Sequence, residues 1–217
     1  MELSRQDPGA GWSAGGDLLA ALGVAQSRGE IGPAALGDHV THALGFLEAC
    51  PELKGAGRIL DLGSGAGLPG LVLAARLPEA RIWLLDGRVG QARLLEAVVA
   101  ELGWSDRVTV VAGRAEVVAH DPELRSSFPA VVARSFGPPA ATAECGAGFL
   151  APDGVLVVSG PPGGAPERWP AGRLAELGLK LDGLAVSPLS FVILRGVERC
   201  PDRFPRRVGV PAHHPLF

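Results

Sequence analysis

The residues that most clearly suggest chemistry lie in a glycine-rich segment from Asp61 to Gly70, which reads Asp-Leu-Gly-Ser-Gly-Ala-Gly-Leu-Pro-Gly. A short apolar run precedes this segment and predicts a strand, and a helix is expected to open at Pro69. Glycines let the backbone turn sharply and let a ligand approach without a clash with Cβ. Unsatisfied N–H groups at the start of a helix suit a carboxylate or a phosphate. The segment therefore predicts a site for a cofactor that carries such a group.

Two cofactor classes could use this turn. The spacing Gly65-x-Gly67-x-x-Gly70 satisfies the dinucleotide fingerprint of a dehydrogenase-like Rossmann protein, although a lone match is a weak signal. In that fingerprint the first glycine lies directly at the strand end, whereas here the expected strand ends in Asp61, and Gly63 and Gly65 follow it. A carboxylate at that position can organise the turn and face the ammonium group of S-adenosylmethionine. These residues favour S-adenosylmethionine, and hence a methyltransferase, over a dinucleotide.

Two further positions are expected at the same site. Asp86 ends the next predicted strand, where a carboxylate can accept hydrogen bonds from both ribose hydroxyls. Its alternative role is that of a helix N-cap. Arg114, Ala115 and Glu116 follow the third predicted strand, where the backbone of Ala115 and Glu116 could bond the edge of an adenine ring. Glu116 suits the first turn of a helix equally well, because the helix dipole favours an acid there, and the residues alone leave both roles open.

Short apolar runs that alternate with amphipathic helices place these residues in an α/β fold. The expected strands are 58–61, 80–86, 107–111, 130–133 and 154–158, and the expected helices are 18–24, 33–50, 90–102, 139–150 and 173–177. This alternation predicts a Rossmann-like, mostly parallel sheet with right-handed crossovers. Two last strands, 180–186 and 191–197, are joined through Ser187-Pro188 and are too close for a helical crossover, so we expect an antiparallel terminal hairpin. Seven strands in this arrangement are typical of a class I S-adenosylmethionine-dependent methyltransferase.

The length of 217 residues fits one such domain, with residues 1–50 as an N-terminal helical cap segment and 51–217 as the methyltransferase domain. Residues 1–16 carry little periodicity and are expected to be frayed, and 161–170 is expected to be a loop. No apolar run is long enough for a membrane span. The first residues also lack the pattern of a secretory signal, so we expect a cytoplasmic protein.

Cysteine and histidine usage gives no sign of a metal or a disulfide framework. Cys50, Cys145 and Cys200 are far apart in the sequence and are expected to be reduced thiols that mostly serve packing. The histidine pairs His39/His42 and His213/His214 have no ligand motif around them, and we interpret them as ordinary surface or partner-facing residues.

The charge distribution is informative mainly at the C-terminus. The formal net charge of −3 is not a nucleic-acid signature for the whole chain. The last part of the chain is nevertheless rich in arginine, and Arg203, Arg206 and Arg207 are candidates for contacts with phosphate groups. The alternative is a tail that packs back on the domain.

Four motifs in order resemble those of the bacterial ribosomal RNA small-subunit methyltransferase G family, also called glucose-inhibited division protein B. They are the Asp61–Gly70 segment with its Leu-Pro-Gly ending, Arg114-Ala-Glu116, Ala133-Arg-Ser-Phe136, and the tail 204–211 followed by Pro215-Leu216. The Leu68-Pro69-Gly70 ending is the specific part, because many methyltransferases share only the first half. The resemblance covers roughly residues 36–217.

The resemblance implies S-adenosylmethionine-dependent methylation of guanine N7 in 16S ribosomal RNA, alone or in the 30S subunit. Gly63 and Leu68 would contact the cofactor, Ala115 and Glu116 would lie at the adenine, and Arg134 would lie near the reacting end. A guanidinium after the fourth strand can hold a carboxylate or phosphate, although a surface ion pair is its alternative role. Guanine N7 already exposes a lone pair, so no general base is required and catalysis would be mainly positioning.

The sequence departs from the family pattern at several positions. Residues 1–35 lack an Asn-Leu-Thr segment, Gly90-Gln91 stands where the family has a Lys-Arg pair, and Ser159-Gly160 stands where it has Lys-Gly. His213 and His214 replace lysines of the tail. The lysine and arginine replacements each remove positive charge from the expected RNA face. They support a second hypothesis, a methyltransferase of the same lineage with another substrate or without activity.

Overall fold

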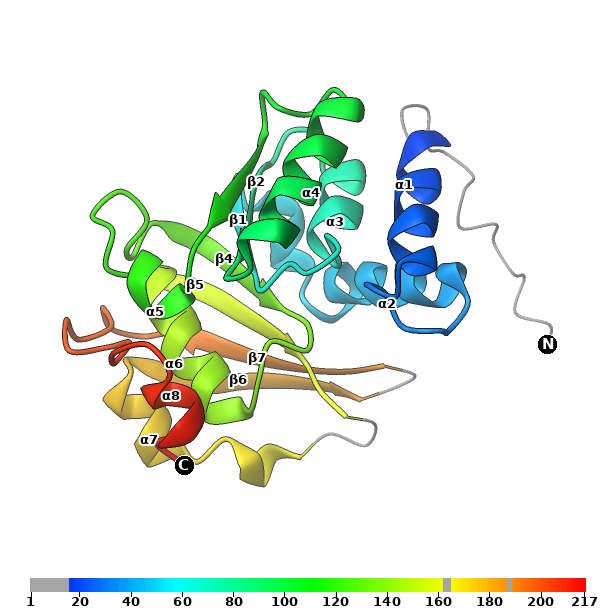
Figure 1. Cartoon of the computed structure of the whole chain (residues 1–217). Helices are drawn as coiled ribbons and strands as arrows, with labels where there is room; N and C mark the ends of the chain where they lie inside the picture. The colour runs from blue at the N-terminus through cyan, green and yellow to red at the C-terminus, as the bar shows by residue number, and fades with distance from the viewer. Residues whose placement is uncertain (1–15, 162–164, 187–188) are drawn as a thin grey trace, which may run out of the picture.

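A seven-stranded sheet forms the centre of the molecule (Figure 1). The structure is a computed structural model, and it describes residues 16–161, 165–186 and 189–217. The expectations for residues 1–15 and for the Ser187-Pro188 connection lie outside the described residues. The strands are β1 (Arg58–Leu62), β2 (Arg81–Asp86), β3 (Val108–Ala112), β4 (Phe128–Ala133), β5 (Leu150–Ser159), β6 (Leu179–Val186) and β7 (Ser190–Gly196).

The strand order is β3-β2-β1-β4-β5-β7-β6. Strands β1 to β5 pair in parallel, whereas β7 pairs antiparallel with both β5 and β6. The prediction of a mostly parallel Rossmann-like sheet with an antiparallel terminal hairpin is therefore confirmed. The central strands β1 and β4 are buried along most of their length and are rich in Ile, Leu, Val and Ala, as expected for a parallel sheet that helices cover on both sides.

Helices cover both faces of the sheet and make two hydrophobic cores. One core lies under α1 (Gly16–Ser27), α2 (Leu36–Ala49), α3 (Gly70–Arg76) and α4 (Val89–Glu101), and the 3₁₀ helix η1 (Pro51–Gly55) joins it. The other core lies under α5 (Ala115–Val118), α6 (Pro139–Phe149) and α7 (Ala171–Glu176), with η2 (Pro166–Arg168) and α8 (Val210–His213) on the same side. In Figure 1 the first group lies at the upper right and the second at the lower left.

The sequence expectation for β5 was wrong at its start. The strand begins at Leu150, beside Phe128 of β4, rather than at residue 154. Pro152, Asp153 and Gly154 read as a turn, and Asp153 does adopt a positive φ of 61°. The sheet pairing nevertheless continues through this kink, since the register shifts between Phe128 and Ala130 to accommodate it.

Helix α6 is buried on all sides because the C-terminal tail covers its outer surface. The side chain of Arg125 donates to the carbonyl oxygens of Phe204, Cys200 and Pro201, at 2.9 to 3.0 Å. On α6, Glu144 is fully buried and accepts hydrogen bonds from the tail. A helix that is buried all round, rather than one with a single apolar face, explains the small residues that dominate its sequence.

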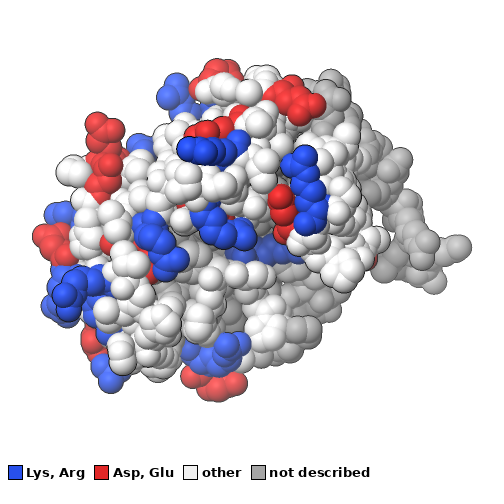
Figure 2. Space-filling model, in the orientation of Figure 1, with Lys and Arg blue, Asp and Glu red and all other residues white. Residues whose placement is uncertain are grey.

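On the face shown in Figure 2, Lys and Arg side chains are interspersed with Asp and Glu. Within the described ranges, no helix has the length and apolar character that crossing a bilayer requires. The thiols of Cys50, Cys145 and Cys200 are all buried, and burial raises the pKa of Cys200 to about 11.

Candidate cofactor site

The candidate site lies where the strand order reverses direction. Strand β1 leads into α3 on one face of the sheet, and its neighbour β4 leads into α6 on the other face. The two connections therefore diverge and leave a crevice at the carboxyl ends of the strands, which is where ligands bind in open α/β sheets. The Asp61–Gly70 segment and Arg134 lie at the two sides of this crevice.

The loop after β1 needs glycines because its backbone adopts positive φ angles and because a neighbouring side chain packs closely against it. Gly63, Gly65 and Gly67 have φ values of 75°, 55° and 95°, which L side chains rarely adopt. A Cβ at Gly63 would also lie 2.6 Å from Cδ2 of Phe136. The loop after β1 is thus pressed against the segment after β4. The strand ends at Leu62, one residue later than expected, and Gly65 still lies beyond the strand end.

Two carboxylates hold this loop in place. Oδ2 of Asp61 accepts the N–H of Gly70 at 2.9 Å, and Oδ2 of Asp86 accepts the N–H of Gly65 at 2.9 Å. Oδ1 of Asp86 also accepts the N–H of Arg88 at 2.8 Å, near the start of α4. Asp61 is fully buried, and this burial raises its pKa to about 7, against the hydrogen bond from Gly70. Its Oδ1 has no partner among the described residues.

A cavity of about 300 Å³ opens over the loop, at the lower end of the range for small-molecule sites. Its floor is the loop from Gly63 to Leu68, and Arg134 and Ser135 form one side after β4. The connection between α1 and α2 forms the opposite wall with Glu30, Ile31 and Gly32. The N-terminal helices therefore complete the cavity, and the sequence patterns did not identify this wall.

Arg134 lies in the cavity wall and is held by His39 of α2. Its Nη2 donates to His39 Nδ1 at 2.7 Å, and His39 Nε2 donates to the carbonyl oxygen of Gly32 at 3.1 Å. His39 is therefore the tautomer with hydrogen on Nε2, because Nδ1 must accept. Burial lowers the pKa of Arg134, against the favourable charge of Asp61. Nη1 of Arg134 is buried and has no partner among the described residues.

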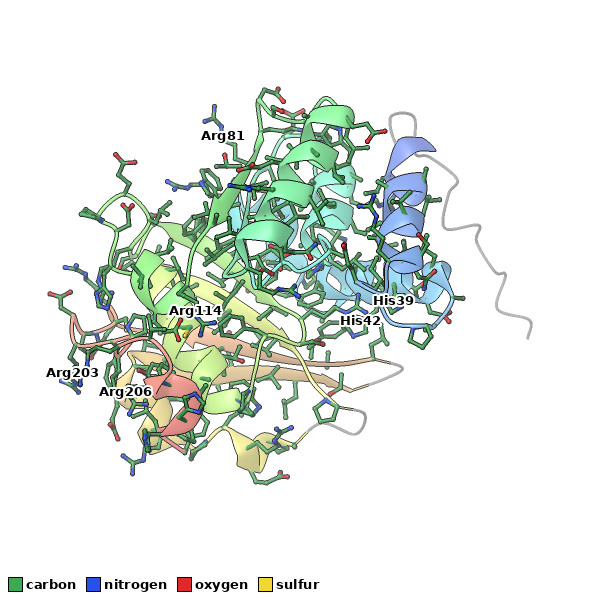
Figure 3. All side chains as sticks on the ribbon, viewed as in Figure 1. His39, His42, Arg81, Arg114, Arg203 and Arg206 are labelled. Atoms are coloured by element: carbon green, nitrogen blue, oxygen red, sulfur yellow. The ribbon has the colours of Figure 1, made fainter. Side chains whose placement is uncertain are left out.

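The interpretation of His39 and His42 as surface or partner-facing histidines was wrong. His39 is only 9% exposed, and His42 is half-buried against the rings of Phe46 and Phe191. Figure 3 shows the two side chains next to each other on α2. Burial, followed by the positive charge of Arg134, lowers the pKa of His42 to about 4. The missed signal was the spacing of His39 and Ala43, which places both on the apolar face of the helix.

Ala115 and Glu116 are placed at the start of α5, after β3, and do not line this cavity. The carboxylate of Glu116 faces the C-terminal tail, where Oε1 accepts the N–H of Gly209 at 3.0 Å and pairs with Arg114 at 3.1 Å. Burial alone would raise the pKa of Glu116, but these two hydrogen bonds hold it below its usual range. Glu116 is thus an acid in the first turn of α5.

The arginines of the tail have different surroundings. Arg206 is bound to buried Glu144, with Nη2 to Oε2 at 2.6 Å and Nε to Oε1 at 2.9 Å. Arg203 and Arg207 are exposed and line a broad groove of about 800 Å³ between α5 and the tail. Figure 3 shows Arg203 and Arg206 on the opposite side of the molecule from His39. Among the described residues, no group of three His, Cys, Asp or Glu side chains is placed to hold a metal ion.

The sheet order and the position of the glycine-rich loop define a class I S-adenosylmethionine-dependent methyltransferase. Solved structures with this fold include an O-methyltransferase from Bacillus cereus in complex with SAH, at 16% identity and a TM-score of 0.59 over 89% of this chain and 93% of that one. Another is N,N-8-amino-8-demethyl-D-riboflavin dimethyltransferase from Streptomyces davawensis, at 20% identity and a TM-score of 0.59 over 83% and 61% of the two chains. These similarities support the fold alone.

Sequence comparison identifies the family. Residues 26–159 match the model of rRNA small subunit methyltransferase G. Relatives include the ribosomal RNA small subunit methyltransferase G of Rubrobacter xylanophilus, 37% identical over 76% of this chain and 67% of its own, and that of Prochlorococcus marinus, 39% identical over 73% and 68%. The chain belongs to the rRNA small subunit methyltransferase G family, and it spans about two thirds of the length of these relatives.

Proposed function

We propose that the protein transfers a methyl group from S-adenosylmethionine to guanine N7 of 16S ribosomal RNA. The observation that carries this proposal is the pairing of the Asp61–Gly70 loop with Arg134 in one cavity, within the part of the chain that matches the family model. The names of the relatives support ribosomal RNA of the small subunit as the substrate. The resemblance in the motifs supports N7 as the target atom.

Different candidate residues would contact different parts of the cofactor. The loop from Gly63 to Leu68 would contact the cofactor, and Arg134 would lie at its methionine end. Asp61 does not line the cavity, and we propose that it acts from beneath the loop, with its buried carboxyl facing the ammonium group. Asp86 would accept the ribose hydroxyls once the side chain of Arg88 leaves it. That side chain is 70% exposed, and an exposed ion pair of this kind contributes little, so its displacement is easy. The backbone of Ala115 and Glu116 would meet the adenine.

The proposed reaction does not require a general base from the protein. S-adenosylmethionine supplies an electrophilic methyl group when it is bound. Guanine N7 offers a lone pair in the major groove, so no proton has to be removed before attack. The residues of this chain would act by holding the two partners in line, and such positioning contributes up to roughly 7–11 kcal/mol in well-oriented systems. We assign Arg134 a positioning role at the reacting end, through the buried Nη1 that has no partner among the described residues.

For the RNA partner, we propose that Arg203 and Arg207 contact phosphates at the groove between α5 and the tail. Arg206, the third arginine of the sequence-based set, has its guanidinium engaged by Glu144. Residues 1–50 would act as a cap, because the α1–α2 connection forms one wall of the cofactor cavity. Since ribosomal RNA is the proposed substrate, we infer that the protein works in the cytoplasm.

A second candidate function is methyl transfer to another substrate. It is favoured by the engagement of Arg206 and by the mixture of both charge signs on the face in Figure 2, because RNA binding depends on clustered positive charge. A dinucleotide-binding protein is the least favoured alternative, given the family match.

Methyl transfer from labelled S-adenosylmethionine to 30S subunits and to 16S RNA tests the proposal. We expect incorporation that falls at least tenfold in Arg134→Ala and Gly63→Asp, and that persists in Arg81→Ala on the opposite edge of the sheet. Mass spectrometry of ribosomal RNA from a deletion strain should find one methylguanosine missing. Labelling of a small molecule without labelling of RNA would instead support the second candidate, and tight binding of NAD alone would refute both.

A further inference from the structure

The side chain of Arg88 lies against the carboxylate that the proposed function gives to the ribose. Arg88 is the second residue after β2, and it lines the cofactor cavity. Its Nε donates to Asp86 Oδ1 at 3.2 Å, and its Nη2 donates to Asp86 Oδ2 at 3.5 Å. A Cβ at Gly65 would lie 3.8 Å from the same Nη2, so the guanidinium also lies next to the glycine-rich loop. Arg88 therefore takes the place in which ribose hydroxyls would meet Asp86.

The carboxylate of Asp86 cannot accept from the guanidinium and from a ribose at the same time. A carboxylate accepts about four hydrogen bonds, two at each oxygen. The backbone N–H of Gly65 takes one place at Oδ2, at 2.9 Å, and the backbone N–H of Arg88 takes one at Oδ1, at 2.8 Å. The guanidinium takes the remaining place at each oxygen, and a pair of ribose hydroxyls needs the same two. The two groups therefore exclude each other.

Asp86 does not depend on the side chain of Arg88 for its position. The two backbone hydrogen bonds are shorter than those of the guanidinium and remain when the side chain leaves. The side chain of Arg88 is 70% exposed, and Asp86 is its only ion-pair partner in the part of the chain that the structure describes. An exposed pair of this kind changes a binding constant by at most about fivefold. Arg88 is thus a weak internal competitor that the cofactor can displace.

The displaced guanidinium is left at the mouth of the cavity. The other carboxylate in the cavity lining is that of Glu30, which accepts from Gln91 Nε2 at 3.3 Å. An RNA substrate has to approach the same mouth to meet the methyl group, and a guanidinium binds a phosphate through paired hydrogen bonds. Ribose and phosphate then both require the ion pair of Arg88 with Asp86 to be broken. Two ligands that require the same internal contact to be broken bind cooperatively, because the contact is lost only once.

We propose that Arg88 couples the binding of the cofactor to the binding of RNA. In the free protein its guanidinium occupies the ribose acceptor, Asp86. The cofactor displaces the guanidinium, which then contacts a phosphate of the RNA substrate. Each ligand therefore strengthens the binding of the other by the same factor. This inference rests on the proposed function, because it takes the ribose to bind at Asp86 and RNA to be the substrate.

Titration calorimetry with S-adenosylhomocysteine tests the competition at Asp86. We expect Arg88→Ala to bind about two- to fivefold more tightly than wild type, because the competitor is removed while the backbone N–H of residue 88 stays. Arg93→Ala removes another exposed arginine of α4 and should bind as wild type does. Salt screens an exposed ion pair, so the advantage of Arg88→Ala should shrink as the salt concentration rises. Both variants should melt within about 2 °C of wild type, since both positions are exposed.

An analogue of S-adenosylhomocysteine without the two ribose hydroxyls identifies the atoms involved. The analogue offers Asp86 nothing in place of the guanidinium, so its Kd should be the same in wild type and in Arg88→Ala. Equal tightening of S-adenosylhomocysteine and the analogue by Arg88→Ala would overturn the competition for Asp86. Equal affinity of Arg88→Ala for the two ligands would refute the placement of the ribose at Asp86, and the coupling with it.

The same titrations in the presence of saturating 16S RNA test the coupling. RNA should tighten the binding of S-adenosylhomocysteine by about two- to fivefold in wild type and in Arg93→Ala, and should leave it unchanged in Arg88→Ala. Coupling that persists in Arg88→Ala, or that is missing from a wild type that binds RNA, would overturn the proposal. Unchanged or weaker binding of S-adenosylhomocysteine by Arg88→Ala without RNA would overturn it as well.

The outcomes separate this inference from the proposed function. A protein that labels 16S RNA but shows none of these effects of Arg88 would refute the coupling alone and leave the proposed function standing. A protein that binds S-adenosylhomocysteine but neither binds nor labels RNA would refute the proposed function, and the coupling with it.

Discussion

His39 and Arg134 join the N-terminal helices to the edge of the sheet through one hydrogen bond of 2.7 Å. The imidazole leaves Nδ1 free to accept because its Nε2 donates to Gly32. Arg134 thereby lines the cavity while its Nη1 has no hydrogen-bond partner among the described residues. A chain that kept Arg134 but lost His39 would retain the family motif and still hold the guanidinium less firmly.

We expect His39→Ala to weaken binding of S-adenosylhomocysteine by about tenfold, the loss of one hydrogen bond to a charged group. His39→Gln should restore much of the affinity, because its amide oxygen can accept from Arg134. Titration calorimetry measures both. His213→Ala, an exposed histidine of the tail, serves as the control and should bind as wild type does. Equal affinities in all three variants would contradict a positioning role for His39.

Asp61 gives a prediction about pH. Its pKa rises from 3.8 to about 7 on folding because the carboxyl is buried, so the native state holds a proton that the unfolded state releases. Between these two values the free energy of unfolding should therefore fall as the pH rises. Asp61→Asn cannot titrate, and its amide oxygen can still accept the Gly70 N–H. In the absence of cofactor, urea unfolding at pH 5, 6, 7 and 8 should show the variant gaining stability relative to wild type as the pH increases.

A constant difference between Asp61→Asn and wild type over this range would contradict the burial-raised pKa. Binding provides a second readout. An ammonium group next to Asp61 would favour its ionised form, so cofactor binding near pH 7 should release protons in wild type and fewer in Asp61→Asn. Calorimetry in two buffers of different ionisation enthalpy measures this release.

At the scale of elements, the loop after β1 and the segment after β4 depend on each other. Gly63 has a φ of 75°, and a Cβ there would run into Phe136. We expect Gly63→Ala to cost about 1–3 kcal/mol of stability and to abolish binding of S-adenosylhomocysteine, because either the loop or Phe136 must move. Chemical denaturation and calorimetry measure the two effects.

Gly37 of α2 is a matched control for that substitution. It lies in a helix, is exposed, and a Cβ at its position would meet nothing within 4 Å. Gly37→Ala should therefore stabilise the protein by about 0.5–1 kcal/mol through helix propensity, with binding unchanged. If Gly63→Ala behaved like Gly37→Ala, the close packing of the loop on Phe136 would be refuted.

The elements also show where sequence patterns are sufficient and where they are not. Long periodic runs such as α4 and the alternation of strands with helices were predicted to within a few residues. The start of β5 was not, because a Pro-Asp-Gly sequence normally ends a strand and only pairing with β4 carries the strand through it. The four-residue helices α5 and α8 are too short to show a helical period.

At the scale of the whole molecule, the arginines of the C-terminal tail differ in their surroundings. Arg206 neutralises the fully buried carboxylate of Glu144, whereas Arg207 is exposed. We expect Arg206→Ala to lower the free energy of unfolding by about 3–5 kcal/mol, since it leaves a buried charge unpaired. Arg207→Ala should leave stability within about 0.5 kcal/mol of wild type. Thermal and urea unfolding measure both.

RNA binding should show the opposite ranking. If Arg207 contacts a phosphate, Arg207→Ala should reduce the slope of log K against log salt by about 0.7–0.9. Arg203→Ala, in the same groove, should behave in the same way. Unchanged slopes in both variants would indicate that the tail serves only to cover α6, and the phosphate contacts would then have to lie elsewhere.

Local patterns in the chain are enough to predict the α/β class and the glycine-rich loop with its two acids, because strand and helix periods and turn glycines are encoded by neighbouring residues. The family followed from the resemblance of four short motifs to known proteins. The partners of the buried polar groups required the folded molecule. The hydrogen bond of His39 with Arg134 and the ion pair of Glu144 with Arg206 join residues that are far apart in the sequence. Such contacts depend on how helices and tail pack on the sheet, and burial then decides which polar side chains must find a partner.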